Sequence, residues 1–135
     1  MILAIDCDGT ICRNKSPDIG EEVPGAFLWL KKFQEAGAKL ILYTMRSDDR
    51  KDGSCPLKEA VEWCRDRGLE FWSHNKNPEQ SEWTTSSKCY ANAYIDDHAI
   101  GCPLVHPDGE RPFVDWSIVG PIVMEKIESY KNRDK

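Results

Sequence analysis

Hydrophobic residues in this chain form short continuous runs that alternate with segments where they recur at helical spacing. The continuous runs predict four buried strands, at residues 2–5, 39–43, 69–72 and 93–95. The periodic segments predict three helices, from Pro24 to the stop at Gly37, from Pro56 through Arg67 to the stop at Gly68, and over about residues 119–131. Polar residues 11–23 predict a loop. Strands that alternate with helices indicate an α/β fold with a mostly parallel sheet.

Length and composition limit the size of this fold. The chain has 135 residues, of which 40% are hydrophobic. That is enough apolar material for one modest core, so we expect one domain spanning residues 1–135.

Charge and targeting signals narrow the class of protein. The chain has 18 basic and 23 acidic residues, a net charge of −5, which argues against a general nucleic-acid footprint but leaves room for a local basic patch. No apolar run is long enough for a membrane span, and the first residues do not read as a signal peptide. We therefore expect a cytoplasmic protein without a membrane partner.

The six cysteines have irregular spacing, and we expect them to be reduced. Cys102 could be grouped with His98 and His106 as a zinc site. These residues lack the paired spacing of structural zinc sites, so ordinary thiols are the preferred interpretation.

Polar side chains follow three of the four predicted strands, at the point where each strand ends. They are Asp6 and Asp8, Thr44 and Arg46, and Asp96 and Asp97. Because the carboxyl ends of parallel strands meet at one edge of a sheet, we expect these side chains to lie together.

Four carboxylates at one edge repel one another unless cations balance them. Oxygen ligands favour Mg²⁺, so Asp6, Asp8, Asp96 and Asp97 are the predicted metal ligands. A lysine would reduce the charge further. Lys88, just before the fourth strand, is the candidate, and Lys76 competes with it.

This set of residues can transfer a phosphoryl group. Asp6 can attack phosphorus and form an aspartyl-phosphate, while Asp8 acts as general acid and then as general base. Thr44 and Lys88 complete the predicted catalytic set. The predicted phosphate- and substrate-binding residues are Gly9, Thr10, Met45 and Arg46.

The segment Asp6-Cys7-Asp8-Gly9-Thr10, followed by Thr44, Lys88 and Asp96-Asp97, resembles the four motifs of the haloacid dehalogenase-like superfamily. The resemblance implies a Rossmann-like three-layer α/β/α domain, Mg²⁺ and the roles given above. Asp8 points to the superfamily's phosphatases. The intervals 11–43 and 45–87 leave no room for a cap domain, so the likeness is to small capless bacterial and phage-type members.

The leading hypothesis is therefore a magnesium-dependent phosphomonoesterase that acts on a phosphorylated small molecule or nucleotide. One alternative is a nucleotidase or nucleic-acid end phosphatase, with Trp83 and Lys76 as candidate contacts. Another is a metal- or phosphate-binding module without turnover, against which the intact pair Asp6 and Asp8 argues.

Overall fold

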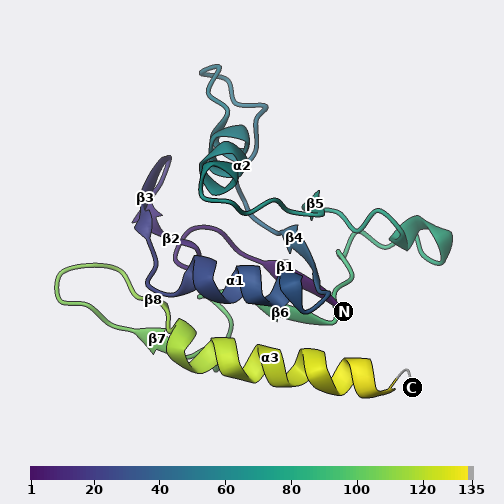
Figure 1. The fold of residues 1–135 in the computed structure, drawn as a ribbon. Coiled ribbons are helices and arrows are strands. Elements are labelled where there is room, and N and C mark those ends of the chain that lie inside the picture. Colours follow the sequence, from purple (N-terminus) through teal and green to yellow (C-terminus); the bar gives the residue numbers. More distant parts are fainter. Residues whose placement is uncertain (134–135) are drawn as a thin grey trace.

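A parallel sheet of four strands in the order β5-β4-β1-β6 lies at the centre of the structure, a computed structural model in which residues 1–133 are described (Figure 1). Residues 134–135 of the predicted domain lie outside the described range. The strands are β1 (Ile2–Ile5), β4 (Lys39–Leu42), β5 (Ser73–His74) and β6 (Ala93–Ile95). Both neighbours of β1 run parallel to it, so the carboxyl ends of all three strands meet at one edge.

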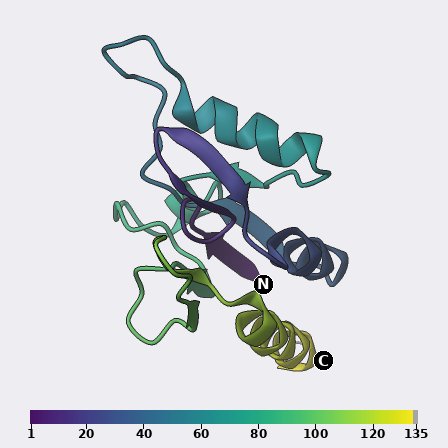
Figure 2. The same ribbon diagram turned by 90° about the vertical axis from the view of Figure 1, so that its left-hand side faces the viewer.

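Three helices follow the sequence pattern, namely α1 (Ala26–Glu35), α2 (Pro56–Asp66) and α3 (Trp116–Arg133). Their buried residues belong to the same core as Leu3 and Ile5 of β1 and Leu40 and Leu42 of β4. Figure 2 shows α2, α1 and α3 one below the other beside the strands. The side chains of alternate strand residues thus meet all three helices.

The other face of the sheet is packed against a loop segment instead of helices. Ala4 lies in register with Tyr94, and the Tyr94 hydroxyl donates to the Cys89 carbonyl at 2.7 Å and accepts from the Ala91 N–H at 3.1 Å. Segment 76–92, with the single 3₁₀ turn η1 (Gln80–Glu82), therefore packs on this side. The chain is an α/β protein, but within residues 1–133 helices form only one of the two outer layers expected.

The expected loop at residues 11–23 is instead a hairpin of β2 (Cys12–Lys15) and β3 (Asp18–Glu22). A second hairpin, β7 (Leu104–Val105) with β8 (Phe113–Val114), precedes α3. Strands β2 and β3 are largely polar, and β7 and β8 are apolar but only two residues long each. Neither pair therefore has the longer apolar run that marks a buried strand in the sequence.

Two predicted boundaries also shift. The third strand pairs with β4 at Ser73–His74 rather than at residues 69–72. Leu69 instead packs fully buried in the core after α2, and within the predicted range Trp72 donates a backbone hydrogen bond to the Leu40 carbonyl of β4 at 2.8 Å. The last helix begins at Trp116 rather than near 119, because Asp115 caps it. Asp115 Oδ1 accepts from the Ser117 N–H at 3.1 Å.

All six cysteines are free thiols, as expected. Within residues 1–133, no helix has the length and apolar character that crossing a membrane requires.

Candidate active site

Three carboxylates meet at the carboxyl edge of the sheet. Asp6 follows β1, and Asp96 and Asp97 follow β6. Oxygen atoms of the three side chains lie within 4.8 Å of one another. The backbone joins the two strand ends as well, because the Asp6 N–H donates to the Ile95 carbonyl at 2.9 Å. We call Asp6, Asp96 and Asp97 the acidic cluster.

Thr10 and Gly9 contact the side chains of the acidic cluster and fix their positions. The fully buried Thr10 hydroxyl lies 3.2 Å from Asp6 Oδ2 and 3.3 Å from the Asp97 N–H. Gly9 has φ +83°, and a Cβ atom there would overlap the Asp97 carboxylate. A glycine is therefore required both by the backbone conformation and by the close approach of Asp97.

Burial and mutual repulsion give the cluster unusual electrostatics. Burial, a hydrogen bond to Asp97 and the charges of Asp96 and Asp97 raise the pKa of Asp6 to about 8. Burial also raises the pKa of Asp97. His98 lies 3.7 Å from Asp97 Oδ2, but its side chain is 76% exposed and offers little compensation. When no metal ion is bound, the acidic cluster therefore holds a proton on Asp6, which a cation could replace.

The cluster opens into a pocket of about 250 Å³, which we call the acidic pocket. Its lining residues are Asp6, Tyr43, Thr44, Met45, Asn75 and Asp96. Thr44 is held in place on both sides, because its N–H donates to Asn75 Oδ1 at 2.7 Å and its hydroxyl accepts from the Arg46 N–H at 3.1 Å. The predicted residues Thr44 and Met45 thus lie beside Asp6.

Tyr43 and Asn75 are pocket residues that the strand-end reasoning did not assign. Tyr43 directly follows β4 and Asn75 directly follows β5. Asn75 also has a positive φ of 59°, which is uncommon for a residue other than glycine. The same rule that selected Asp6 would have selected Asn75 if the third strand had been placed at residues 73–74, and Tyr43 if the second strand had been ended at Leu42.

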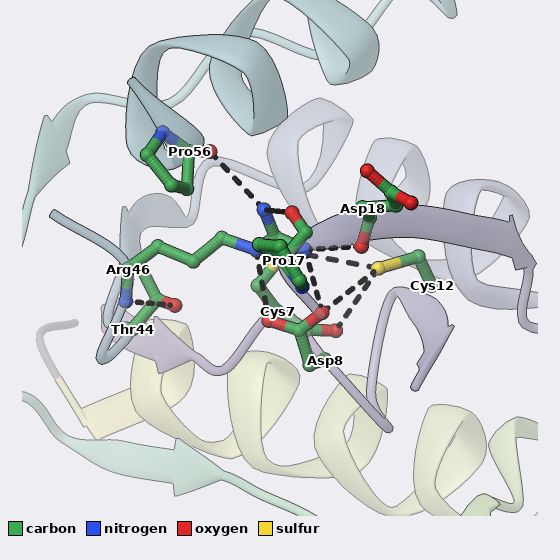
Figure 3. A network of polar contacts seen from close by, with 8 residues as sticks. All are labelled: Cys7, Asp8, Cys12, Pro17, Asp18, Thr44, Arg46 and Pro56. Atoms are coloured by element: carbon green, nitrogen blue, oxygen red, sulfur yellow. Dashed lines mark hydrogen bonds and ion pairs between the residues drawn. The ribbon is translucent and has the colours of Figure 1, made fainter. Parts of the chain in front are cut away.

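Asp8 does not join the acidic cluster. Both of its carboxylate oxygens accept hydrogen bonds from the Arg46 guanidinium, each at 2.8 Å (Figure 3). Cys12 Sγ lies 3.7 Å from Asp8 Oδ1 on the other side. The structure therefore brings together three of the four predicted metal ligands and pairs the fourth with an arginine.

Arg46 is buried instead of reaching into the acidic pocket. Besides Asp8, its guanidinium donates to the carbonyls of Pro17, Asp18 and Pro56 at 2.9 to 3.3 Å (Figure 3). Hydrogen bonding to Asp8 raises the pKa of Arg46. Arg46 thus holds the β2–β3 hairpin and the start of α2 to the turn after β1, which differs from the predicted contact with a substrate phosphate.

Lys88 lies outside the acidic pocket. Its Nζ is 5.7 Å from the centre of the Tyr94 ring, in a second depression that also includes Trp83. Lys76 is exposed. The role of Lys88 in catalysis stays a prediction, as does the competing role of Lys76. Among residues 1–133, the acidic cluster is the only metal-competent group found, so Cys102, His98 and His106 do not form one.

The parallel sheet, its helices and the acidic strand ends define an α/β protein with a polar site at the carboxyl edge. A solved structure of a conserved protein coded by a locus of Bacteroides thetaiotaomicron has the same fold. It is 38% identical, with a TM-score of 0.73, and the alignment covers 93% of this chain and 91% of that chain. The chain belongs to the same family as this Bacteroides protein. No protein-family model and no curated protein matches the chain.

Proposed function

We propose that this protein is a magnesium-dependent phosphohydrolase that works through an aspartyl-phosphate on Asp6. The observation that carries the proposal is the convergence of Asp6, Asp96 and Asp97 within 4.8 Å beside a pocket that also contains Thr44. The resemblance of the segment Asp6–Thr10 to the haloacid dehalogenase-like superfamily supports the same reading and would make the protein a capless, Rossmann-like member.

The donor set of the acidic cluster fits a divalent cation. It consists of carboxylate oxygens, which Mg²⁺ prefers. Burial, the hydrogen bond to Asp97 and the charges of Asp96 and Asp97 raise the pKa of Asp6, and a nearby cation would offset the repulsion among these carboxylates. Asp6, Asp96 and Asp97 would hold the ion, with Thr10 fixing the orientation of Asp6. A bound ion would supply charge neutralisation for the phosphate and keep Asp6 ionised.

The proposed reaction has two steps. In the first, an oxygen of Asp6 attacks phosphorus, the bond from phosphorus to the leaving oxygen breaks, and that oxygen takes a proton. In the second, water attacks the aspartyl-phosphate and gives a proton to a base, which restores the Asp6 carboxylate and releases phosphate. The hydroxyl of Thr44 and nearby backbone N–H groups hold the phosphoryl oxygens.

Asp8 carries the proton in this proposal, and its pairing with Arg46 restricts that role. Both carboxylate oxygens of Asp8 accept hydrogen bonds from the Arg46 guanidinium, which holds the side chain outside the acidic cluster. To give a proton to the leaving oxygen or to take one from water, Asp8 must turn from Arg46 toward the substrate.

The deciding experiment measures magnesium-dependent hydrolysis of an aryl phosphate by the purified chain and by Asp6→Asn. Removing the nucleophile should abolish turnover, whereas Asp108→Asn, at an exposed loop position away from the pocket, should leave it intact. Equal rates for the chain and Asp6→Asn would refute the proposal.

The pairing of Asp8 with Arg46 also favours a second candidate, a metal-binding module without turnover. This module would unfold at higher denaturant concentration with Mg²⁺ than with EDTA, because an ion bound only to the folded state stabilises it. It would release no phosphate from a broad panel of phosphate esters. Hydrolysis of any ester that Asp6→Asn abolishes would exclude it.

A further inference from the structure

Exposed aromatic side chains gather beside the acidic pocket. The exposed fraction is 38% for Tyr43, 58% for Trp83, 43% for Tyr90 and 41% for Tyr94. One exposed aromatic residue needs no explanation, but four near one another leave a large apolar surface in water. A contiguous surface of this kind, rimmed by polar groups, marks a binding site.

Three of these rings line a depression of about 470 Å³, which we call the aromatic groove. Trp83, Tyr90 and Tyr94 form its apolar wall, and Lys88 adds a positive charge. The Trp83 and Tyr90 rings meet edge to face, with centroids 5.7 Å apart. The groove thus combines flat apolar faces with a cation, which are the elements that recognise single-stranded nucleic acid.

Tyr43 and Tyr94 connect the aromatic groove to the acidic pocket. Tyr43 lines the pocket, Tyr94 lines the groove, and their ring centroids lie 6.3 Å apart. A ligand with its phosphate beside Asp6 can therefore continue over Tyr43 and Tyr94 toward Trp83 without leaving the surface.

Hydrogen bonds fix the loop that carries the groove. Gln80 is 9% exposed, and its amide donates to the carbonyls of Ser86 and Lys88 at 3.0 and 2.7 Å. Its oxygen accepts from the Tyr90 N–H at 2.7 Å. The Tyr94 hydroxyl is held as well, between Cys89 and Ala91. The loop backbone and the Tyr94 ring are thus held in place before a ligand arrives, which lowers the entropy cost of binding.

The charge distribution favours binding of one end of a nucleic-acid strand over binding along the whole length of the strand. Lys88 Nζ lies 5.7 Å from the Tyr94 ring centre, where it can meet a phosphodiester between two stacked bases. The net charge of −5 opposes extended binding to a polyanion. Contacts are therefore expected only near the acidic pocket, where a bound cation would reduce the repulsion.

We propose that the aromatic groove stacks the terminal bases of a single-stranded oligonucleotide whose phosphorylated end enters the acidic pocket. The proposal rests on the proposed function and names its substrate class. Tyr43 and Tyr94 lie closest to the pocket and take the terminal base, Trp83 and Tyr90 take the next, and Lys88 contacts the linking phosphate. Two ring pairs along one path distinguish such a strand from a mononucleotide, which would need only the first.

Strand binding can be measured apart from hydrolysis. Thymidine hexanucleotides with a phosphate on the 3′ or the 5′ end are labelled at the opposite end and titrated with the Asp6→Asn chain in Mg²⁺, with fluorescence anisotropy as the signal. Trp83→Leu in this background should raise the Kd about 5- to 150-fold, the usual range for one base-stacking aromatic residue. Trp83→Phe keeps a ring and should retain most of the affinity.

Leu28→Ala is the matched control, because Leu28 is also 58% exposed but lies on α1. It should leave the Kd unchanged. Any of three results would overturn the proposal. The Kd of Trp83→Leu could equal that of its parent, or Leu28→Ala could raise the Kd as much as Trp83→Leu does. Thymidine monophosphate could also compete for binding as well as the hexanucleotide.

The proposed function and this inference fail separately. If the chain with Asp6 intact hydrolyses an aryl phosphate but Trp83→Leu leaves strand binding unchanged, the phosphohydrolase stands and the groove proposal falls. If strand binding depends on Trp83 but no phosphate ester is cleaved, the groove proposal keeps its support and the catalytic proposal falls.

Discussion

The guanidinium of Arg46 grips both carboxylate oxygens of Asp8, from Nε and Nη2, at 2.8 Å each. The Arg46 side chain is 4% exposed and that of Asp8 is 19% exposed, so both charges are largely withdrawn from water. Each charge needs the other, because an unpaired buried charge costs several kcal/mol. The pair joins the turn after β1 to the segment between β4 and α2.

Arg46→Ala should therefore lower the free energy of unfolding by about 3–5 kcal/mol, since it leaves Asp8 without its partner. Arg46→Lys should cost less, but still a clear amount, because a single ammonium cannot reproduce the planar fork that also reaches the Pro17 and Asp18 carbonyls. Urea unfolding followed by circular dichroism measures both changes.

Asp8→Asn supplies the control for this pair. If the ion pair is the cause, combining Asp8→Asn with Arg46→Ala should cost less than the sum of the single changes, by more than about 0.5 kcal/mol. Additive losses would mean that the carbonyl contacts of Arg46, and not Asp8, carry the effect.

The core elements of this fold can be predicted from the sequence because their signals lie within each segment. Strands β1, β4 and β6 coincide with continuous apolar runs, as buried parallel strands should. Helices α1 and α2 end at the glycines that the pattern indicated, and Gly37 and Gly68 both have positive φ. The strand-end rule then placed Asp6, Asp96 and Thr44 together without knowledge of any contact.

The parts that were not predicted depend on distant partners. The β2–β3 hairpin is polar in sequence, and Arg46 contacts its turn through backbone carbonyls that carry no sequence signal. The direction of Asp8 follows from the turn at Gly9 and from Arg46, 38 residues later. Spacing alone could not separate Asp8 from Asp6, because both follow the same strand.

The packing of α1 on α3 leads to a prediction with an unusual sign. A Cβ atom at Gly120 would overlap the Trp29 indole. Helix propensity alone would make Gly120→Ala stabilising by about 1 kcal/mol. We expect a net loss instead, because overpacking typically costs about 1–3 kcal/mol before propensity is added. Thermal or urea unfolding of the variant decides the sign.

Two further variants isolate the cause. Ser129→Ala, at an exposed position of the same helix, should raise the free energy of unfolding slightly, because only the helix propensity changes there. In a Trp29→Leu background the smaller side chain makes room, so Gly120→Ala should lose its cost. A stabilising Gly120→Ala in the unaltered chain would show that α1 and α3 can separate freely.

Gly9 and Gly37 form a natural pair for testing the acidic cluster. Both have positive φ, +83° and +97°, but a Cβ atom would overlap Asp97 only at Gly9 and meets nothing within 4 Å at Gly37. Gly37→Ala should cost only the backbone strain, about 1–2 kcal/mol. Gly9→Ala should cost more and should also weaken stabilisation by Mg²⁺, because Asp97 is displaced. Urea titrations with Mg²⁺ and with EDTA test this, and equal losses with equal responses to Mg²⁺ would contradict it.

The shared proton of the acidic cluster predicts how stability depends on pH when metal is absent. The pKa of Asp6 rises from an ordinary value of 3.8 to about 8 in the folded chain. Between about pH 4 and pH 8 the folded state therefore binds more protons than the unfolded state, so the free energy of unfolding falls as pH rises. One proton contributes a slope of at most about 1.4 kcal/mol per pH unit. Denaturation in EDTA across this window measures the slope.

Asp6→Asn removes the titrating group and should flatten this profile, whereas Asp108→Asn, at an exposed position, should leave it unchanged. Mg²⁺ competes with the proton for the same carboxylates, so its stabilising effect should be larger at pH 8 than at pH 5. The free energies of unfolding measured in Mg²⁺ and in EDTA should thus diverge as pH rises. A magnesium effect that is independent of pH, or that survives in Asp6→Asn, would place the ion away from Asp6 and leave the raised pKa of Asp6 without a link to metal binding.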